Sequence, residues 1–311
     1  MLTPLSAHAC ERYPWGTTAS VQQRSIGNET VGRIGVSAIG LGAMPLSTKE
    51  NRPSPAEAEA VVRAALDAGV TLIDTADAYS YDEAEFGHNE SLVAAALAAY
   101  GSGADDVLVA TKGGHTREGT AWGLDGSPSY LRRACEASLK RLGVDAIGLY
   151  QFHRPDPSTP WDVSMAGLRA LFDDGLVRML GISNASIPQI DAARAILGPA
   201  LVSVQNQFSP GYRSSAVELA HCAEHGLAWL PWSPFGGVSA AGSLDAAAPA
   251  FAEVAEELGV SVYQVTLAWH LAQADVVIPI PGASRPQSIV DSAAATHVRL
   301  TDDQLTRLNT A

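Results

Sequence analysis

The sequence contains few cysteines, and their spacing argues against two kinds of cysteine-based architecture. Cys10, Cys135 and Cys222 are the only three in 311 residues, and no two of them form a C-x-x-C pair. A disulfide framework needs an even set of cysteines, and a thiolate zinc site needs closely paired ones. We therefore expect neither, and we expect the chain to work in a reducing compartment.

Basic residues and long apolar runs are also scarce. Lys and Arg number 20 against 33 Asp and Glu, which gives a formal net charge of −13, and the sequence pI is about 4.9. Nucleic acid and anionic membranes require clustered Lys and Arg, so neither is an expected partner. No apolar run reaches the roughly 18 residues of a membrane helix, and the opening segment has no basic stretch followed by an apolar one. We expect a soluble, cytoplasmic protein.

What the sequence does have is a regular alternation of short apolar segments with longer amphipathic ones. The strand candidates are Ser37–Leu41, Thr71–Asp74, Val107–Thr111, Ile147–Phe152, Val177–Ile182, Val202–Asn206, Leu227–Pro231 and Val276–Pro279. Their nearly continuous apolarity is typical of parallel strands that are covered on both faces. A domain count from length gives two at about 150 residues each, but single α/β barrels commonly occupy about 250 residues. Eight strand–helix units without a low-complexity linker favour one (β/α)₈ TIM barrel.

Three of the intervening helices have recognisable start signals. Ser54-Pro55-Ala56-Glu57 has the pattern of a capping box with proline at the first helical position. Thr159-Pro160-Trp161-Asp162 opens a helix that should end near Gly175. Ser186-Ile187-Pro188-Gln189 opens another, which Gly198-Pro199 should close.

Additional elements are expected at both ends of the barrel domain, which we place at residues 21–311. Residues 1–20 are expected to form a loosely ordered N-terminal arm. The segment Val21–Val36 contains the turn signal Gly27-Asn28 and predicts a β-hairpin at the barrel floor. Near the C-terminus, Asp245–Leu258 and Thr301–Asn309 each predict an extra helix.

Four polar residues follow the predicted strands at the end where TIM barrels place their chemistry. Asp74 ends the second strand and Tyr79 follows it, while Lys112 and His153 follow the third and fourth strands. A free tyrosine titrates near 10, and a neighbouring ammonium would lower its pKa toward the working range. Asp74 could balance the charge of Lys112, and His153 could hold a carbonyl oxygen by a hydrogen bond. This set predicts a site that donates a proton to a carbonyl.

Seven segments in one order resemble the aldo-keto reductase family. They are LIDTADAY…GHNESLVAAAL, VLVATKGG, IGLYQFHRPDP, VRMLGISNAS, VSVQNQFSP, LPWSPFGG and VIPIPGASRPQSI, and the resemblance extends from Val31 to Ala295. It implies that Asp74, Tyr79, Lys112 and His153 are the catalytic tetrad. Tyr79 would protonate the carbonyl oxygen while a nicotinamide delivers hydride, and Lys112 paired with Asp74 would tune Tyr79. A non-catalytic remnant of the tetrad is the alternative reading.

The resemblance also implies the positions that bind the nicotinamide cofactor. Ser183, Asn184 and Gln205 match residues that hydrogen-bond the carboxamide, and Trp232 stands where the family usually stacks a tyrosine. The other positions that the resemblance assigns to the cofactor lie near the tetrad or in the loop expected over the pyrophosphate. They are Gly42, Ala43, Met44, Asp74, His153, Ser233, Pro234, Phe235 and Gly237. Taken without the family, each would be ordinary core or loop.

The segment expected at the adenosine end departs from the family's pattern. Gly282-Ala283-Ser284-Arg285-Pro286 resembles its phosphate-binding turn, with a helix N-terminus that attracts anions. Later positions that often carry arginine, glutamine or asparagine are here Ser288 and Ser292. Arg285 is the nearby cation that could meet a 2′-phosphate. NADPH is therefore the expected cofactor, and use of NADH stays open.

The substrate pocket is expected to be formed by Met44, Tyr79, Tyr81, Trp122, His153 and Arg154. Arg154 would either contact an anionic or polar substrate or pair with Asp156 or Asp162. The substrate would be a small, partly aromatic aldehyde or ketone, with pyridoxal as the specific hypothesis because the motifs look most like bacterial members. A tailoring ketoreductase acting on a sugar or a secondary metabolite is one alternative. An NADP(H)-binding redox sensor is another, and the sequence leaves the oligomeric state open.

Two further motifs are set aside. His221-Cys222-Ala223-Glu224-His225 fits the H-x-x-E-H pattern of a zinc protease group, but Gly226 ends the helix and the sequence reveals no third ligand, so no metal site is expected. No G-x-G-x-x-G follows the first strand, so a Rossmann domain is not supported.

Overall fold

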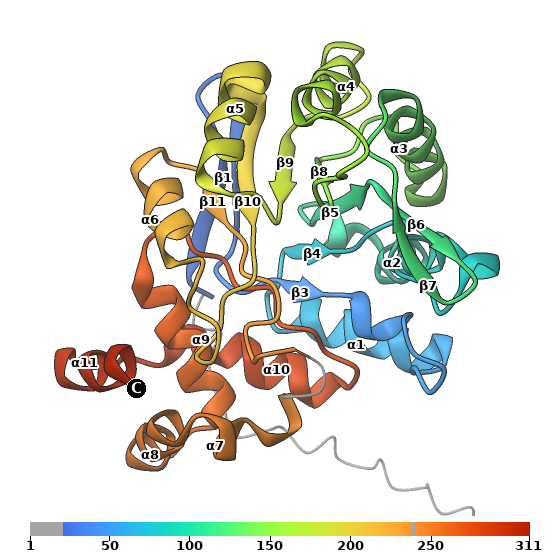
Figure 1. Ribbon diagram of the computed structural model, residues 1–311. Helices are drawn as coiled ribbons and strands as arrows, with labels where there is room; N and C mark the ends of the chain where they lie inside the picture. Colours follow the sequence, from blue (N-terminus) through green and yellow to red (C-terminus); the bar gives the residue numbers. More distant parts are fainter. Residues whose placement is uncertain (1–20, 238–240) are drawn as a thin grey trace, which may run out of the picture.

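A parallel sheet forms the centre of the molecule. The computed structural model describes residues 21–237 and 241–311, so the predicted N-terminal arm lies outside the described residues. Neighbouring strands are hydrogen-bonded in the order β11-β10-β9-β8-β5-β4-β3 (Figure 1). Their bounds are β3 (Leu41–Gly42), β4 (Leu72–Asp74), β5 (Leu108–Gly113), β8 (Leu149–Phe152), β9 (Leu180–Ser183), β10 (Leu201–Gln205) and β11 (Ala228–Trp229). All neighbouring pairs are parallel, as the apolar runs predict.

The two edges of this sheet are joined by the predicted eighth strand. On one side, Trp229 N–H donates to the carbonyl of Val276 at 2.8 Å, and Ile278 N–H donates to that of Trp229 at 2.8 Å. On the other side, the amides of Gly40 and Gly42 donate to the carbonyls of Pro279 and Pro281, each at 2.9 Å. Proline has no N–H to return these bonds, so the segment makes only isolated bridges and no regular strand. The closed (β/α)₈ barrel is nevertheless confirmed.

An antiparallel hairpin covers the amino end of the barrel, as predicted. Its strands are β1 (Gln23–Asn28) and β2 (Gly32–Ser37), and β1 packs against β10 and β11. Ile26 and Val36 are buried in one apolar cluster with residues that begin the barrel strands, such as Leu72, Leu108 and Leu149. The predicted turn position is wrong, because Gly27 and Asn28 pair across the hairpin and the turn occupies residues 29–31. The side chain of Asn28 accepts from the amides of Thr30 and Val31 and so forms the turn.

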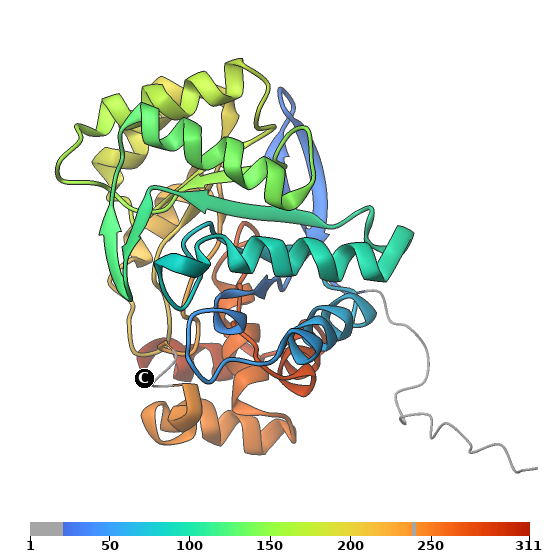
Figure 2. The same cartoon turned by 90° about the vertical axis from the view of Figure 1, so that its right-hand side faces the viewer.

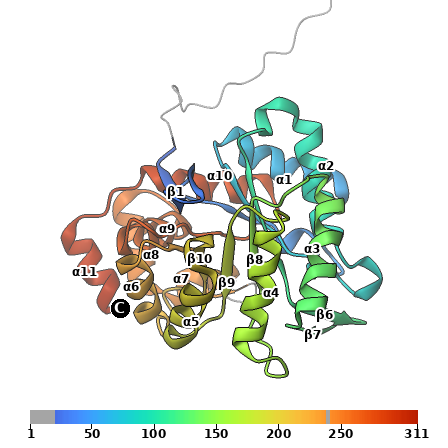
Figure 3. The same cartoon turned by 90° about the horizontal axis from the view of Figure 1, so that it is seen from above.

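Helices surround the barrel on the outside (Figure 3). They are α1 (Pro55–Asp67), α2 (His88–Tyr100), α3 (Pro128–Leu142), α4 (Trp161–Asp173), α5 (Ile187–Leu197), α6 (Ala216–Glu224), α9 (Val262–Gln273) and α10 (Pro286–Ala294). Short 3₁₀ turns are η1 (Met44–Leu46), η2 (Glu83–Glu85), η3 (Gly101–Ala104), η4 (Gly198–Ala200), η5 (Ala241–Ser243) and η6 (Ala295–His297). The capping box at Ser54 and the helix start at Ser186 are confirmed, and α4 begins where Trp161 predicts.

The extra helices near the C-terminus are present, with one correction. The predicted helix over Asp245–Leu258 is two helices, α7 (Leu244–Ala247) and α8 (Pro249–Leu258). Pro249 restricts the residue before it to an extended conformation, and Ala248 has φ −136° and ψ 69°, so the helix breaks there. The last helix, α11 (Asp302–Thr310), starts at a capping box on Thr301. No helix among the described residues is long and apolar enough to span a bilayer.

A second hairpin follows β5 and is not predicted by the sequence. It pairs β6 (His115–Glu118) with β7 (Ala121–Leu124), outside the barrel sheet (Figure 2). Its strands are short and half polar, so they lack the apolar alternation of a strand. The turn at Gly119, where φ is +54°, is the signal that could have located it.

Candidate active site

The four residues of the predicted tetrad meet at the carboxyl end of the barrel. Asp74 is the last residue of β4, Lys112 lies in β5, His153 follows β8, and Tyr79 lies in the loop after β4. Lys112 Nζ donates to Asp74 Oδ1 at 2.5 Å, to the carbonyl of Thr75 at 2.9 Å and to Tyr79 Oη at 3.0 Å. The Tyr79 and His153 rings are 5.5 Å apart, edge to face. The side chains of all four are buried.

The second oxygen of Asp74 is held by two amides. Gln205 Nε2 donates to Asp74 Oδ2 at 2.8 Å, and Gln151 Nε2 donates to the same oxygen at 3.2 Å. The carboxylate therefore has partners on both oxygens, as a buried charge needs. The sequence does not single out Gln151, because it occurs within an apolar strand motif. Gln205, expected at the cofactor carboxamide, thus has a contact within the protein as well.

Burial and charge together set the protonation of Tyr79. Burial raises the pKa of Tyr79, and the ammonium of Lys112 opposes the shift without cancelling it. Burial lowers the pKa of Lys112, but Asp74 and Tyr79 more than offset this and the net shift is upward. At neutral pH the site therefore holds a protonated phenol beside a charged ammonium. The expectation of a lowered tyrosine pKa is wrong here, because a buried phenolate loses more hydration than the ammonium returns.

His153 is neutral for a related reason. Burial, reinforced by the charge of Lys112, holds the pKa of His153 well below its usual range. Its Nδ1 is buried and has no hydrogen-bond partner among the described residues. A neutral imidazole carries a proton on only one nitrogen. If His153 carries it on Nε2, its Nδ1 has no proton and therefore needs no acceptor.

A cavity of about 660 Å³ opens beside these side chains. The expected cofactor and substrate residues that line it are Gly42, Met44, Asp74, Tyr79, Trp122, His153, Arg154, Ser183, Asn184, Gln205, Trp232, Ser233, Pro234, Phe235, Gly237, Gly282 and Ser284. The sequence does not single out four others, which are Pro45, Lys49, His115 and Ile280. Residues at or after the ends of all seven sheet strands and of the segment 276–282 thus share one concave surface.

Five of the expected residues do not line the cavity. Ala43 is buried behind it, with its amide donating to the carbonyl of Asp74. Tyr81 is not among the residues that line the cavity, and its backbone carbonyl accepts from Arg117. Arg285 is the exposed residue before α10, and Ser288 and Ser292 lie within that helix.

His115 and Trp122 come from the β6–β7 hairpin and form one wall of the mouth. The ring of His115 is 4.3 Å from that of His153 and 5.2 Å from that of Trp122. His115 Nδ1 lies 2.9 Å from the carbonyl of Gly123, which can only accept, so Nδ1 carries the proton. Burial lowers the pKa of His115, which leaves the ring neutral and Nε2 as a hydrogen-bond acceptor.

Arg117 fixes this wall to the loop that carries Tyr79. Its Nη2 donates to the carbonyls of Ser80 at 2.8 Å and Tyr81 at 2.5 Å. Its guanidinium lies over the ring of Trp122, 4.1 Å from the ring centre. Glu83 of the same loop also bonds Gly119, with Glu83 N–H donating to the Gly119 carbonyl at 2.9 Å, so the hairpin and the loop after β4 are joined at two places.

Neither expected ion pair of Arg154 forms. Its Nη2 donates to Asn184 Oδ1 at 3.3 Å, and the side chain lines the cavity. The carboxylate of Asp156 accepts from the amide of Gly126 instead, and Asp162 makes no ion pair among residues 21–237 and 241–311. The structure therefore favours the cavity-facing reading over the pairing one.

Left-handed backbone shapes the cofactor side of the cavity. Asn184 has φ +59°, and its Nδ2 donates to the carbonyl of His153 at 3.0 Å. Ser233 has φ +52° and Gly237 has φ +96°, so the loop after Trp232 curls sharply. Non-glycine residues rarely adopt this conformation, and such positions cluster at binding sites.

The H-x-x-E-H motif acquires a third neighbour that the sequence does not reveal. The helix ends at Glu224, just before His225 and Gly226, as the glycine predicts. Asp191 of α5 lies beside His221 and His225 and is a candidate third ligand that the sequence does not identify. Cys222 and Cys135 are buried free thiols, and Cys10 lies outside the described residues.

Comparisons with known proteins agree with this arrangement. The sequence profile of the Aldo/keto reductase family matches residues 38–311. A 6-dehydroglucose reductase of Novosphingobium aromaticivorans is 38% identical over 275 residues, covering 86% of this chain and 88% of that protein. An uncharacterized oxidoreductase of Schizosaccharomyces pombe is 30% identical over 296 residues, covering 94% of this chain and 92% of that protein.

Among solved structures, a glycerol dehydrogenase of Gluconobacter oxydans superposes with a TM-score of 0.78. It is 28% identical, with 94% of this chain and 95% of that chain covered. The profile match, the identity to curated relatives and the superposition agree: the chain belongs to the aldo/keto reductase family of oxidoreductases.

Proposed function

We propose that the protein reduces the carbonyl group of a small molecule to an alcohol, with NADPH as the hydride donor and Tyr79 as the general acid. The observation that supports this most is the contact chain from Asp74 through Lys112 to Tyr79, whose hydroxyl borders the cavity. The family assignment supports the same reaction class. A positioned general acid contributes typically ~10²–10⁴-fold to the rate.

In this proposal the protein's own residues handle the proton. Tyr79 gives its hydroxyl proton to the carbonyl oxygen, and Lys112 stabilises the tyrosinate that remains, at the 3.0 Å contact. Asp74 keeps Lys112 charged, and the amides of Gln151 and Gln205 keep Asp74 in place. His153 donates from Nε2 to the same carbonyl oxygen. Tyrosinate then regains a proton from solvent.

The cavity residues fit a nicotinamide cofactor, which supplies a hydride to the carbonyl carbon when bound. Ser183, Asn184 and Gln205 would hold the carboxamide, and the indole of Trp232 would lie against the nicotinamide face. The curled loop from Ser233 to Gly237 would cover the pyrophosphate with its backbone amides. Its left-handed residues are the structural feature that a phosphate-binding loop requires.

The adenosine end is proposed at the start of α10. The N-terminus of this helix presents the positive end of the helix dipole to an anion, and Ser284 lies just before it in the cavity wall. Arg285 is exposed and makes no ion pair within the described part of the chain, so it can contact a 2′-phosphate. This favours NADPH over NADH.

The substrate is proposed to carry a hydroxyl group near its carbonyl. His115 Nε2 is an acceptor within the cavity and has no hydrogen-bond partner among the described residues. The His115 ring is 4.3 Å from that of His153, which is proposed to hold the carbonyl oxygen. A hydroxyl on a neighbouring carbon would therefore reach His115, and Arg154 and Asn184 add polar groups to the same mouth.

Two substrate classes meet this description. Pyridoxal is an aldehyde with a hydroxyl on the adjacent ring carbon, and the ring of Trp122 would border it. Oxidised sugars are the other class, in line with the relative called a 6-dehydroglucose reductase. Of the two, the polar mouth and the identity to that relative favour the sugar class.

The test measures loss of NADPH absorbance with a panel of aldehydes and ketones that includes pyridoxal and keto-sugars. We expect turnover with hydroxylated carbonyls, and Tyr79→Phe should abolish it while NADPH still binds. If the parent protein binds NADPH but is as inert as Tyr79→Phe across the panel, the protein is a redox sensor and the proposed reduction is wrong.

A further inference from the structure

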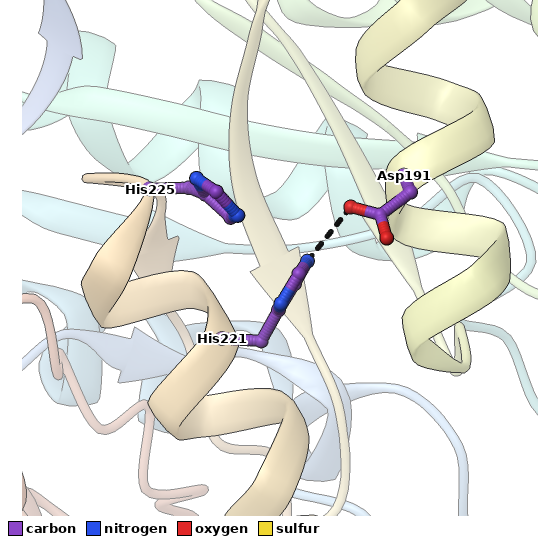
Figure 4. A group of neighbouring side chains, drawn as sticks. All are labelled: Asp191, His221 and His225. Carbon is purple, nitrogen blue, oxygen red and sulfur yellow. Dashed lines mark hydrogen bonds and ion pairs between the residues drawn. The ribbon is translucent and has the colours of Figure 1, made fainter.

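Three metal-ligating side chains gather on the outside of the barrel, far from the tetrad in the fold. His221 and His225 come from the end of α6, and Asp191 comes from α5 (Figure 4). One ligand atom from each lies within 4.8 Å of the other two. His221 Nε2 is 2.8 Å from Asp191 Oδ1. The proposed reductase reaction uses none of these groups.

The local backbone places both imidazoles on one side of α6. His221 lies in the last turn of α6 and His225 is the residue that caps its end, four positions later, so the two rings lie side by side. Their ring centres are 4.5 Å apart with planes at 77°. In Figure 4 both rings extend from α6 toward Asp191. The backbone amide of His225 donates to the carbonyl of His221 at 3.2 Å, but its ring makes no hydrogen bond among residues 21–237 and 241–311, so the ring nitrogens are available.

We propose that Asp191, His221 and His225 form a binding site for Zn²⁺ that links α5 to α6. Imidazole nitrogen and carboxylate oxygen are ordinary zinc ligands at about 2.0–2.2 Å, and a tetrahedral site separates them by roughly 3.4 Å. The present separations, 2.8 Å for one pair and at most 4.8 Å for the others, need only side-chain rotation to reach this. Asp191 is half exposed, so water can fill the fourth position.

One neighbouring cation opposes the metal. Arg194 Nη1 lies 3.2 Å from the same Asp191 Oδ1, one turn along α5. The arginine side chain is partly exposed and on a flexible stem, so it can turn into solvent when zinc takes that oxygen. Surface ion pairs of this kind contribute little, whereas two imidazoles and a carboxylate bind zinc jointly. Arg194 should therefore lower the affinity for zinc without preventing zinc from binding.

The experiment titrates untagged, chelator-treated protein with ZnCl₂ in a non-coordinating buffer by calorimetry. A Cys10→Ser background removes one thiol from the titration, because thiolates are also zinc ligands. We expect one Zn²⁺ per chain and a higher thermal midpoint of unfolding with zinc. Zinc should bind at least about tenfold more weakly to His221→Ala and to His225→Ala, because removing a ligand costs at least as much affinity as removing a group that hydrogen-bonds a ligand. Arg194→Ala should bind zinc more tightly than the parent.

His297→Ala is the matched control, because it removes an exposed histidine outside the cluster. Its zinc affinity should equal that of the parent. Circular dichroism and reductase activity of each variant show whether the barrel is intact, since the cluster lies outside the catalytic machinery. The proposal is overturned if the parent binds no zinc, or if His221→Ala and His225→Ala bind it as tightly as His297→Ala does.

Discussion

Removing a single oxygen from Tyr79 separates its chemical role from its structural one. In Tyr79→Phe, Lys112 Nζ loses the 3.0 Å contact but keeps Asp74 at 2.5 Å and the carbonyl of Thr75 at 2.9 Å. The buried ammonium therefore stays paired, and the aromatic ring keeps its edge contacts with His153 and Trp122. The fold should tolerate the change well.

The expected magnitudes differ for stability and for rate. The lost hydrogen bond should lower the free energy of unfolding by about 1 kcal/mol or less. Loss of the general acid should lower kcat ~10²–10⁴-fold, which corresponds to roughly 3–5 kcal/mol in the activation barrier. The effect on the barrier should thus exceed the effect on stability several times over, while the affinity for NADPH changes little.

The assay combines kcat from NADPH consumption, NADPH affinity from tryptophan fluorescence, and urea unfolding. Tyr150→Phe is the matched control: Tyr150 is a second buried tyrosine, in β8, and its hydroxyl has no partner among the described residues. That variant should keep full activity and equal or higher stability. A Tyr79→Phe enzyme with kcat within a few-fold of the parent would refute the assignment, as would an equal loss in Tyr150→Phe.

Three further predictions concern substrate, cofactor and pH. His115→Phe should raise KM roughly three- to tenfold for a hydroxylated carbonyl, because one hydrogen bond to the substrate is lost. The KM of an unsubstituted aldehyde should not change, and an equal effect on both substrates would contradict the substrate proposal. Arg285→Ala should weaken NADPH by roughly tenfold or more and NADH hardly at all, measured as Kd. Burial lowers the pKa of His270 to about 4. The unfolded chain therefore takes up a proton first as pH falls, and His270 should contribute about 3 kcal/mol to the stability lost between pH 6.5 and 4. His153, whose pKa is also lowered by burial, adds to this loss, so His270→Asn should reduce the loss in urea unfolding by about that amount without abolishing it.

The tetrad could be predicted from sequence because strand ends determine where it lies. Asp74, Lys112 and His153 each stand at or directly after an apolar run, and parallel strands bring their carboxyl ends to one rim. That argument needs no knowledge of loops. It predicts which side chains meet but not their protonation, since the raised pKa of Tyr79 depends on how completely the barrel buries it.

The sequence does not predict those site residues whose positions depend on irregular backbone or on packing between distant segments. His115 lies on a hairpin whose strands lack an apolar period, and Gln151 is a polar residue inside an apolar strand. Asp191 joins His221 only because α5 and α6 pack side by side, which no local pattern encodes. By contrast, the helix break at Pro249 was readable, because proline disfavours a helical residue before it.

The guanidinium of Arg117 connects the cavity wall at Trp122 to the loop that carries the proposed general acid, Tyr79. It bonds the two residues that follow Tyr79 and stacks on Trp122 of the outer wall. A change of hairpin sequence that moved Arg117 or Gly119 would therefore be transmitted to the loop that carries Tyr79. Redesign of this enzyme's selectivity should accordingly exchange residues 115–124 as one unit while keeping its connections at Arg117 and Gly119.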